Sequence, residues 1–259
     1  MIFLTFDIEE FDCPLPYSQT LTFEQQMSIS IYGTVRILDL LQKKGVKATF
    51  FCTAIFAINA PDIIKRIIKE GHEVASHGYL HGSFETVHLK ESKEVLEEMI
   101  GEEVIGFRMA NMKPVDSLAV LEAGYKYNSS LNPTFLPGNY NNLDQPRKIF
   151  FEKGVCQIPA SVTPWVRMPL FWLSLHNLPM KLYKWLCLKT IEKDGYINLY
   201  LHPWEFEDLT KPDIDLPWYI VRNSGEKLIS RLEILIEYFQ KRKFLFGTLK
   251  DCLTLFPEK

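Results

Sequence analysis

Short apolar runs recur throughout the chain, and several are separated by segments in which apolar residues repeat with helical spacing. Alternation of these two patterns indicates strands that alternate with helices, and therefore an α/β fold with a largely parallel sheet or barrel. The runs that we interpret as strands are Ile2–Phe6, Val46–Cys52, Glu73–Ala75, Val104–Phe107, Cys156–Ile158, Tyr196–Leu201 and Phe244–Phe246.

The expected helices carry their own start and stop signals. A helix that includes Ile31 and Leu38 is expected to end at Gly45, because glycine readily adopts the left-handed backbone that closes many helices. Pro61 is expected to open a second helix, which Gly71 ends. Two further apolar stripes predict helices at Val95, Leu96, Met99 and Ile100, before Gly101, and at Leu228, Leu232, Leu235, Ile236 and Phe239. We interpret all these stripes as core-facing rather than as cofactor-binding.

The composition is that of a single folded domain over residues 1–259. The chain is 47% hydrophobic, so it can bury a substantial core. Its net charge of −3, without a basic cluster, gives no electrostatic footprint for nucleic acid. The five cysteines lack a Cys-x-x-Cys pair, which favours free thiols in a reducing compartment. Because the N-terminus also lacks a signal-peptide pattern, we predict a cytoplasmic protein.

Residues 133–188 interrupt the alternation as a loop followed by an aromatic-rich insertion. The stretch 132–146 is rich in Pro, Asn and Gly and predicts a long ordered loop. Residues 165–188 are rich in aromatic and aliphatic side chains, but the uninterrupted apolar runs are too short to span a membrane. This segment is either a subdomain helix packed on the barrel or an interfacial segment that meets a lipid-linked substrate.

Two histidines four residues apart, His77 and His81, follow the expected strand Glu73–Ala75. On a helical turn such a pair shares one face and can hold one divalent ion. A catalytic zinc usually takes three protein ligands, and Asp7 and Glu9 follow the first strand with the same side-chain phase if that strand continues. Two imidazoles and a carboxylate suit zinc or another transition metal such as cobalt. The alternatives are a solvated acidic turn and a surface histidine pair.

Arg108 and His202 lie at the ends of expected strands, as Asp7 does. In parallel barrels the catalytic groups gather at the carboxyl ends of the strands. A buried arginine needs an anionic partner, which Asp7 would supply. His202 is a candidate proton donor, and its alternative role is a structural histidine under the loop. The remaining histidines are interpreted as structural or surface residues: His72, His88 and His176.

Taken in order, these motifs resemble those of the polysaccharide deacetylases, the NodB-homology or carbohydrate esterase family 4 group. The resemblance implies a distorted (β/α) barrel of about seven strands, a bound divalent metal and hydrolysis of an N-acetyl or similar amide on a sugar. The segments that carry it are Thr5–Asp7, Ala48–Phe51, Gly71–His77 with His81, Gly106–Arg108, Gly124–Ser130 and Tyr200–Pro203.

The resemblance also implies a role for each motif residue. Asp7 corresponds to the catalytic base, and Arg108 to the residue that holds it. His77 and His81 correspond to the metal-binding pair, and His202 to the acid that protonates the leaving amine. The aspartate that orients this acid in the family has no counterpart that the sequence identifies.

Two positions depart from the family pattern. Ile8 stands where the family has a second aspartate, so the third metal ligand is expected from Glu9 or, as the alternative, from Glu10. Ala110 stands where the family has proline, and the backbone N–H of Asn111 becomes the candidate oxyanion donor.

The sequence therefore predicts a metal-dependent hydrolase that removes an acyl group from an amino sugar or saccharide. The alternatives are a degenerate member that binds saccharide without cleaving it, a metal-dependent amidohydrolase acting on a non-sugar amide, and a barrel whose histidines are all structural. A lipid-linked or nucleotide-linked sugar at the cytoplasmic face of a membrane is the expected partner. Trp165, Trp204 and Trp218 are candidates for stacking on sugar rings, or else belong to the core.

Overall fold

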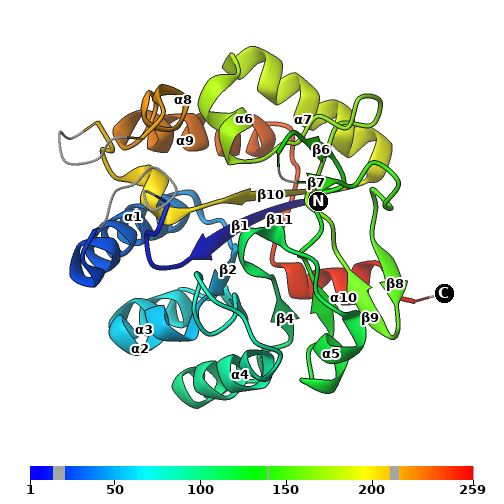
Figure 1. Cartoon of the computed structure of the whole chain (residues 1–259). Helices are drawn as coiled ribbons and strands as arrows, with labels where there is room; N and C mark the ends of the chain where they lie inside the picture. Colours follow the sequence, from blue (N-terminus) through cyan, green and yellow to red (C-terminus); the bar gives the residue numbers. More distant parts are fainter. Residues whose placement is uncertain (14–20, 139, 211–215, 259) are drawn as a thin grey trace.

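The computed structural model describes residues 1–13, 21–138, 140–210 and 216–258, and most of their strands join one curled sheet (Figure 1). The strands are β1 (Ile2–Ile8), β2 (Thr49–Cys52), β3 (Glu73–Ser76), β4 (Gly106–Phe107), β5 (Tyr127–Asn128), β6 (Phe135–Leu136), β7 (Tyr140–Asn141), β8 (Phe150–Glu152), β9 (Val155–Gln157), β10 (Ile197–Leu201) and β11 (Phe246–Gly247). The sheet order is β10-β1-β2-β3-β4-β5-β9-β8, and β11 pairs with the start of β1.

The strands from β10 to β9 run parallel in this order, and β8 is antiparallel to β9. This arrangement confirms the predicted distorted barrel. The gap between β9 and β10 is bridged through Ser161, whose backbone N–H donates to the carbonyl of Asn198 at 2.9 Å. The Asn198 N–H in turn donates to the Ser161 hydroxyl at 2.8 Å. Several strands are shorter than predicted. For example, β4 begins at Gly106 rather than at Val104.

Helices surround the outside of the curled sheet (Figure 1). They are α1 (Phe23–Lys44), α2 (Ala54–Asn59), α3 (Pro61–Lys69), α4 (Val87–Ile100), α5 (Ser117–Glu122), α6 (Trp172–Asn177), α7 (Met180–Asp194), α8 (Trp218–Val221), α9 (Glu226–Gln240) and α10 (Cys252–Leu255), with short 3-10 turns η2 (Ala110–Met112), η3 (Pro203–Phe206) and η4 (Leu249–Asp251). Gly45 closes α1 in the left-handed conformation, and Pro61 is the first residue of α3, as expected. The sequence signals did not indicate the short helix α2.

Strand β1 separates two apolar layers by its alternating side chains. Ile2, Leu4, Phe6 and Ile8 belong to the core between sheet and helices. Phe3 belongs to a second cluster inside the curled sheet. Because alternate residues share a face, Asp7 has the same phase as Phe3 and lies inside the barrel. Asp7 is therefore held inside the fold rather than on its outer surface, and it is only 3% exposed.

Two expected local structures differ from the sequence prediction. The segment after β3 is a loop rather than a helical turn, because Gly78 takes a left-handed backbone with φ of 86° directly after His77. The stretch 132–146 contains the small hairpin of β6 and β7, apart from residue 139, which lies outside the described residues.

The aromatic-rich insertion forms α6 and α7. Tyr183, Cys187 and Ile191 of α7 are buried in the core, whereas Leu182 and Trp185 remain exposed. Among the described residues, no helix combines the length and the apolar composition that crossing a membrane requires.

Helix α1 fixes the loop that follows β10. Gly33 faces η3 so closely that an added Cβ atom would lie 1.8 Å from the carbonyl oxygen of Pro203. The Arg36 side chain donates a hydrogen bond to the carbonyl of Phe206 at 2.8 Å. Because His202 directly precedes η3, this close contact sets the position of the His202 side chain.

Candidate active site

The predicted site residues meet at the carboxyl edge of the parallel sheet. Asp7 is the penultimate residue of β1, and His77, Arg108 and His202 directly follow β3, β4 and β10. Parallel strands of similar length end at one edge, so side chains separated by more than a hundred residues converge there. Asp7, His77 and His202 line one shared cleft, and Arg108 is buried against Asp7.

Arg108 is fully buried and paired with Asp7. Its Nη1 lies 2.6 Å from Asp7 Oδ1 and 2.9 Å from the Thr5 hydroxyl. The other side of the guanidinium donates to the Ser129 hydroxyl at 2.9 Å and to the Ser129 carbonyl at 3.2 Å. A buried charge pair with this many hydrogen bonds fixes the carboxylate in place. The second oxygen of Asp7, Oδ2, faces His202 Nε2 at 4.0 Å.

Glu9, His77 and His81 form a group whose ligand atoms all lie within 4.8 Å of one another. Oε2 of Glu9 lies 3.2 Å from Nε2 of His77 and 3.1 Å from Nε2 of His81. Two ligand atoms that each bond a tetrahedral zinc at about 2.1 Å lie about 3.4 Å apart. The spacing of these three residues therefore fits one small divalent metal ion.

The hydrogen bonds of the two imidazoles explain why both Nε2 atoms are available as ligands. His77 Nδ1 lies 2.9 Å from the carbonyl of Arg108, and His81 Nδ1 lies 2.8 Å from Asp12 Oδ2. Both partners accept only, so each Nδ1 carries the proton and each neutral ring presents an Nε2 lone pair. Lone pairs aimed at a carboxylate oxygen need a cation or an added proton between them. The donor set is the one expected for a metal site.

The close contacts within this group shift the pKa values of Glu9 and His81. Burial raises the pKa of Glu9, but the charge of His81 and the hydrogen bond from His77 outweigh it and bring that pKa to about 2. Burial lowers the pKa of His81, and the charges of Glu9 and Asp12 reverse this and raise it to about 9. Without a metal, an imidazolium at His81 thus balances the buried carboxylate.

Glu10 does not join this group. Its Oε2 accepts a hydrogen bond from the Thr53 hydroxyl at 2.7 Å, and burial raises its pKa. Glu9 and Glu10 are consecutive residues directly after β1, so their side chains diverge. Of the two carboxylates left open by the sequence, only Glu9 is placed among the histidines.

His202 has an orienting carboxylate that the sequence analysis missed. Glu205 Oε1 lies 2.8 Å from His202 Nδ1 and also accepts the backbone N–H of His202. Burial lowers the pKa of His202, but Glu205, Glu9 and Asp7 outweigh this and raise it above the usual histidine value. The signal was the three-residue spacing in His-Pro-Trp-Glu, which a 3-10 turn closes into a contact.

Two other residues missed in the sequence are Asp12 and His176. Asp12 orients His81. Because Asp12 lies only a few residues after the first strand, the sequence alone does not distinguish it from an acidic residue in a solvated turn. His176, interpreted as structural or surface, is fully buried and lies 2.9 Å from Glu205 Oε2. Its helix α6 lies within the aromatic-rich insertion, where no local pattern pointed to the site.

The structure changes the interpretation of Trp204. This ring is 2% exposed and packs against His202, Phe11 and Trp172. Its Nε1 donates to Glu9 Oε1 at 3.2 Å. Stacking on a sugar requires an open ring face. Trp204 lines the cleft but is almost fully buried, and the contact that the structure gives it is to Glu9, so its role as a sugar contact stays a prediction.

The other candidates for substrate contact differ in exposure. Trp165 and Trp218 are 66% and 65% exposed and do not line the cleft. Asn111 does line it, with a left-handed backbone at φ of 57° in η2. Its position beside the cleft agrees with the sequence-based expectation for an oxyanion donor, whose role stays a prediction.

The cleft itself has a volume of about 580 Å³ and contains Asp7, Glu9, His77, His81 and His202. Asp12, Cys13, Gly82 and Asn111 also line it, and its other walls are apolar or aromatic: Met112, Leu136, Tyr140, Phe171, Trp172, Leu173, Tyr200, Trp204, Tyr219 and Ile220. Largely apolar walls with a few convergent polar groups are typical of a site that binds a small molecule.

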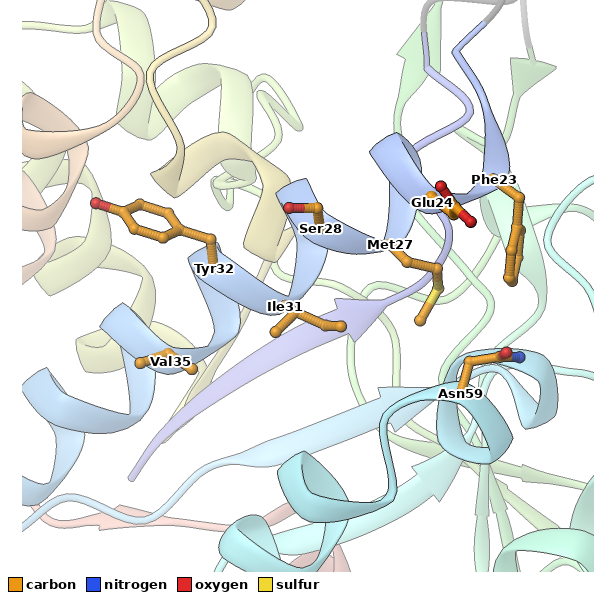
Figure 2. Close-up of a pocket in the computed structure, with 8 residues that line it drawn as sticks. All are labelled: Phe23, Glu24, Met27, Ser28, Ile31, Tyr32, Val35 and Asn59. Carbon is orange, nitrogen blue, oxygen red and sulfur yellow. The ribbon is translucent and has the colours of Figure 1, made fainter.

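A second hollow of about 730 Å³ lies along the outer face of α1 (Figure 2). Side chains from successive turns of α1 line it together with Asn59 of α2, and Glu24 is its one titratable carboxylate. It contains none of the paired acids, bases or ligands found in the smaller cleft. Chemistry rather than volume therefore distinguishes the candidate active site.

Fold and site together define an α/β barrel protein with a Glu-His-His cluster that could hold a metal ion, and with an Asp-Arg pair and a His-Glu pair at the same edge. Residues 12–127 match the family model described as polysaccharide deacetylase. The match covers somewhat less than half of the chain and confirms the resemblance inferred from the motifs. Asp7, Glu9 and His202 lie outside the matched residues, so their assignment depends on the geometry above.

Individual relatives cover the chain to different extents. A peptidoglycan-N-acetylglucosamine deacetylase of Bacillus cereus is 35% identical over 102 residues, which are 38% of this chain and 35% of the relative. A probable polysaccharide deacetylase of Pseudomonas aeruginosa shares the fold with a TM-score of 0.68 at 16% identity, over 100% of this chain and 92% of the other. The matches span about a quarter and a third of the lengths of the first two curated relatives.

A pseudoenzyme of carbohydrate esterase family 4 from Bacillus anthracis also shares the fold, with a TM-score of 0.53 at 14% identity over 98% of this chain and 65% of that chain. The fold alone therefore does not establish activity. The argument for activity has to come from the side chains of the cleft.

Proposed function

We propose that this protein is a metal-dependent hydrolase that removes an N-acetyl or similar acyl group from an amino sugar or saccharide. One observation carries the proposal: a buried Asp7–Arg108 pair, a Glu9-His77-His81 ligand set and a carboxylate-oriented His202 all open onto one cleft. Relatives named as peptidoglycan and chitooligosaccharide deacetylases support the substrate class.

Within the ligand set, Glu9 takes the role of the family's second aspartate. Glu9, His77 and His81 would hold a zinc ion or a related metal such as cobalt. When bound, the metal supplies a Lewis acid that polarises the amide carbonyl and lowers the pKa of an attacking water.

The remaining steps belong to side chains of this chain. Asp7, paired with Arg108, accepts the proton of the attacking water. The N–H of Asn111 stabilises the charge that develops on the carbonyl oxygen, a contact typically worth about 3–4 kcal/mol. His202, held by Glu205, donates its Nε2 proton to the nitrogen so that the amine leaves as the C–N bond breaks. Asp7 then returns its proton to His202, whose Nε2 lies 4.0 Å from Oδ2.

Metal analysis and product detection test this proposal together. The purified protein, loaded with zinc or cobalt, should contain about one metal ion and release acetate from N-acetylated chitooligosaccharides. Stoichiometric metal with no acetate from any saccharide, but turnover of a simple cyclic or formyl amide, would favour the non-sugar amidohydrolase. Absence of both metal and turnover would favour the saccharide-binding alternative.

We further propose that the substrate is a lipid-linked sugar met at the cytoplasmic face of a membrane, rather than a nucleotide-linked one. The turn at 163–168 presents Trp165 and Val166, which are 66% and 77% exposed. Arg167 anchors this turn by donating to the carbonyl of Gln145 at 2.7 Å, and exposed tryptophan is typical of lipid interfaces.

The five free thiols support a reducing compartment. Vesicle flotation should lose binding in Trp165→Ser, and no binding by the unaltered protein would refute the lipid contact.

A further inference from the structure

A buried hydrogen-bonded chain extends from His202 away from the cleft. His202 Nδ1 lies 2.8 Å from Glu205 Oε1, and Glu205 Oε2 lies 2.9 Å from His176 Nε2. His176 and Glu205 are both 0% exposed. His176 belongs to α6, whereas Glu205 and His202 belong to the loop after β10, so the tertiary fold alone brings the three together.

The two oxygens of Glu205 have different partners. Oε1 accepts both the ring Nδ1 and the backbone N–H of His202. Oε2 faces His176 Nε2, which is the one hydrogen-bond donor that the described residues offer to it. A buried carboxylate oxygen without a donor carries a large desolvation cost. Loss of the His176 donor would therefore favour protonation of Glu205 or rotation of its carboxylate away from His202.

The surroundings of His176 determine which nitrogen holds its proton. Its Nδ1 is buried without a hydrogen-bond partner among the described residues. A lone pair tolerates this better than an N–H group does, so a neutral ring with its proton on Nε2 fits the site. Trp172 contacts both imidazoles edge-on, with ring centroids 6.0 Å from His176 and 5.5 Å from His202. This packing limits rotation of either ring.

The electrostatics of Glu205 agree with this arrangement. Burial raises the pKa of Glu205, but the hydrogen bonds from His176 and His202 outweigh it and hold that pKa below its usual range. The negative charge of Glu205 is thus left to stabilise the imidazolium of His202.

We propose that His176 is a positioning residue for proton donation: it fixes Glu205, which in turn orients His202 toward the leaving nitrogen. This inference rests on the proposed amide hydrolysis and assigns His176 a part in it. His176 does not line the cleft, so it acts only through Glu205 and His202.

Leaving-group dependence separates this role from a general structural one. An amide must be protonated as the amine departs, whereas 4-nitrophenolate leaves an ester without protonation. His176→Leu, in the metal-loaded protein, should lower kcat for an N-acetylated chitooligosaccharide by about 10- to 100-fold with little change in KM. Its kcat for 4-nitrophenyl acetate should change less than about threefold. His176→Gln, whose amide can donate to Glu205, should restore most of the amide activity.

A matched control is His72→Gln. His72 is also buried, but it packs on Phe50 and bonds Ala48 far from the cleft. This variant should change amide and ester hydrolysis equally. An equal loss of both activities in His176→Leu, or no rescue by His176→Gln, would overturn the proposal. If His176→Leu does not fold, His176→Asn serves as the test variant instead, because the asparagine side chain is polar but too short to donate to Glu205.

A second measurement does not depend on activity. Nitrogen-resolved NMR of the histidine rings in the metal-free protein should show a hydrogen-bonded Nδ1–H on His202 in the unaltered protein and in His176→Gln. This signal should be lost or exchange-broadened in His176→Leu. Its persistence there would contradict the role of His176, whereas absent hydrolysis with the expected NMR change would refute only the proposed function.

Discussion

Asp7 and His202 face each other across the cleft, with Oδ2 of the aspartate 4.0 Å from Nε2 of the histidine. Each is held from behind by an oppositely charged residue: Arg108 pairs with Asp7, and Glu205 pairs with His202. A base and an acid on either side of one reacting centre are what amide hydrolysis requires. Glu9, His77 and His81 lie beside this pair. Separate mutations can therefore test the proton-transfer role of the pair and the metal-binding role of the three ligands.

Replacing Asp7 with asparagine should retain metal and abolish nearly all turnover. The amide keeps the shape of the side chain but cannot accept the water proton, so kcat should fall by about 10²- to 10⁴-fold. Acetate release and metal content, measured on the same sample, check this. Asp62→Asn, at an exposed carboxylate, serves as control. Unchanged hydrolysis in Asp7→Asn would remove Asp7 from the role of base.

The choice between Glu9 and Glu10 predicts opposite outcomes for two neighbouring substitutions. Glu9→Gln should weaken metal binding strongly, because Glu9 is the only carboxylate among the three clustered ligands. Glu10→Gln should bind metal as the unaltered protein does, since Glu10 bonds Thr53 instead. Cobalt titration followed by visible absorption measures both. Equal loss in the two variants would contradict the assignment.

The metal-free protein should lose stability as pH rises from about 6.5 to 9. The pKa of His81 is raised to about 9 in the folded state. A histidine whose folded pKa is raised contributes full stability below its unfolded pKa of about 6.5 and loses it as pH rises through the folded value. Thermal melting across this range should therefore show a falling Tm.

Two variants check the origin of this pH dependence. His81→Gln should have a lower Tm at pH 6.5 and a flatter profile, whereas His88→Gln should resemble the unaltered protein. A profile in His81→Gln that is as steep as that of the unaltered protein would show that another group is responsible.

Trp204→Phe tests whether this residue orients a ligand or contacts sugar. Phenylalanine preserves the ring packing but removes the Nε1–H that bonds Glu9. Loss of such a supporting hydrogen bond typically weakens metal affinity by about 10- to 100-fold. KM for the saccharide, measured at saturating metal, should stay the same. A raised KM with normal metal affinity would instead return Trp204 to the role of a sugar contact.

Gly33→Ala should impair catalysis from outside the cleft. Alanine normally stabilises a helix by about 1 kcal/mol relative to glycine, but here the new methyl group would press on the Pro203 carbonyl. Displacement of η3 would shift His202 and Glu205, and a misplacement of about 1 Å can cost up to about 100-fold in rate. Ser28→Ala, on the exposed face of the same helix, is the control for kcat and Tm.

The sequence by itself determined the strand-and-helix alternation, because apolar periodicity, the helix stop at Gly45 and the helix start at Pro61 are local properties. It also placed Asp7, Arg108 and His202 at strand ends, from which a shared edge follows for any parallel sheet. The phase of Asp7 along β1 was equally local, whereas Glu9 lies just beyond the end of that strand.

Only the tertiary structure decided which groups support these residues. The partners of His202 and His81 are side chains of loops and turns, whose paths depend on packing rather than on periodicity. Gly78 replaced an expected helical turn with a loop, and the histidine pair converges because Asp12 and the Arg108 carbonyl hold its rings. His176 reaches Glu205 from a helix that no sequence pattern connects with the site. Long-range contacts of this kind arise from the closure of the barrel, which short-range sequence signals do not encode.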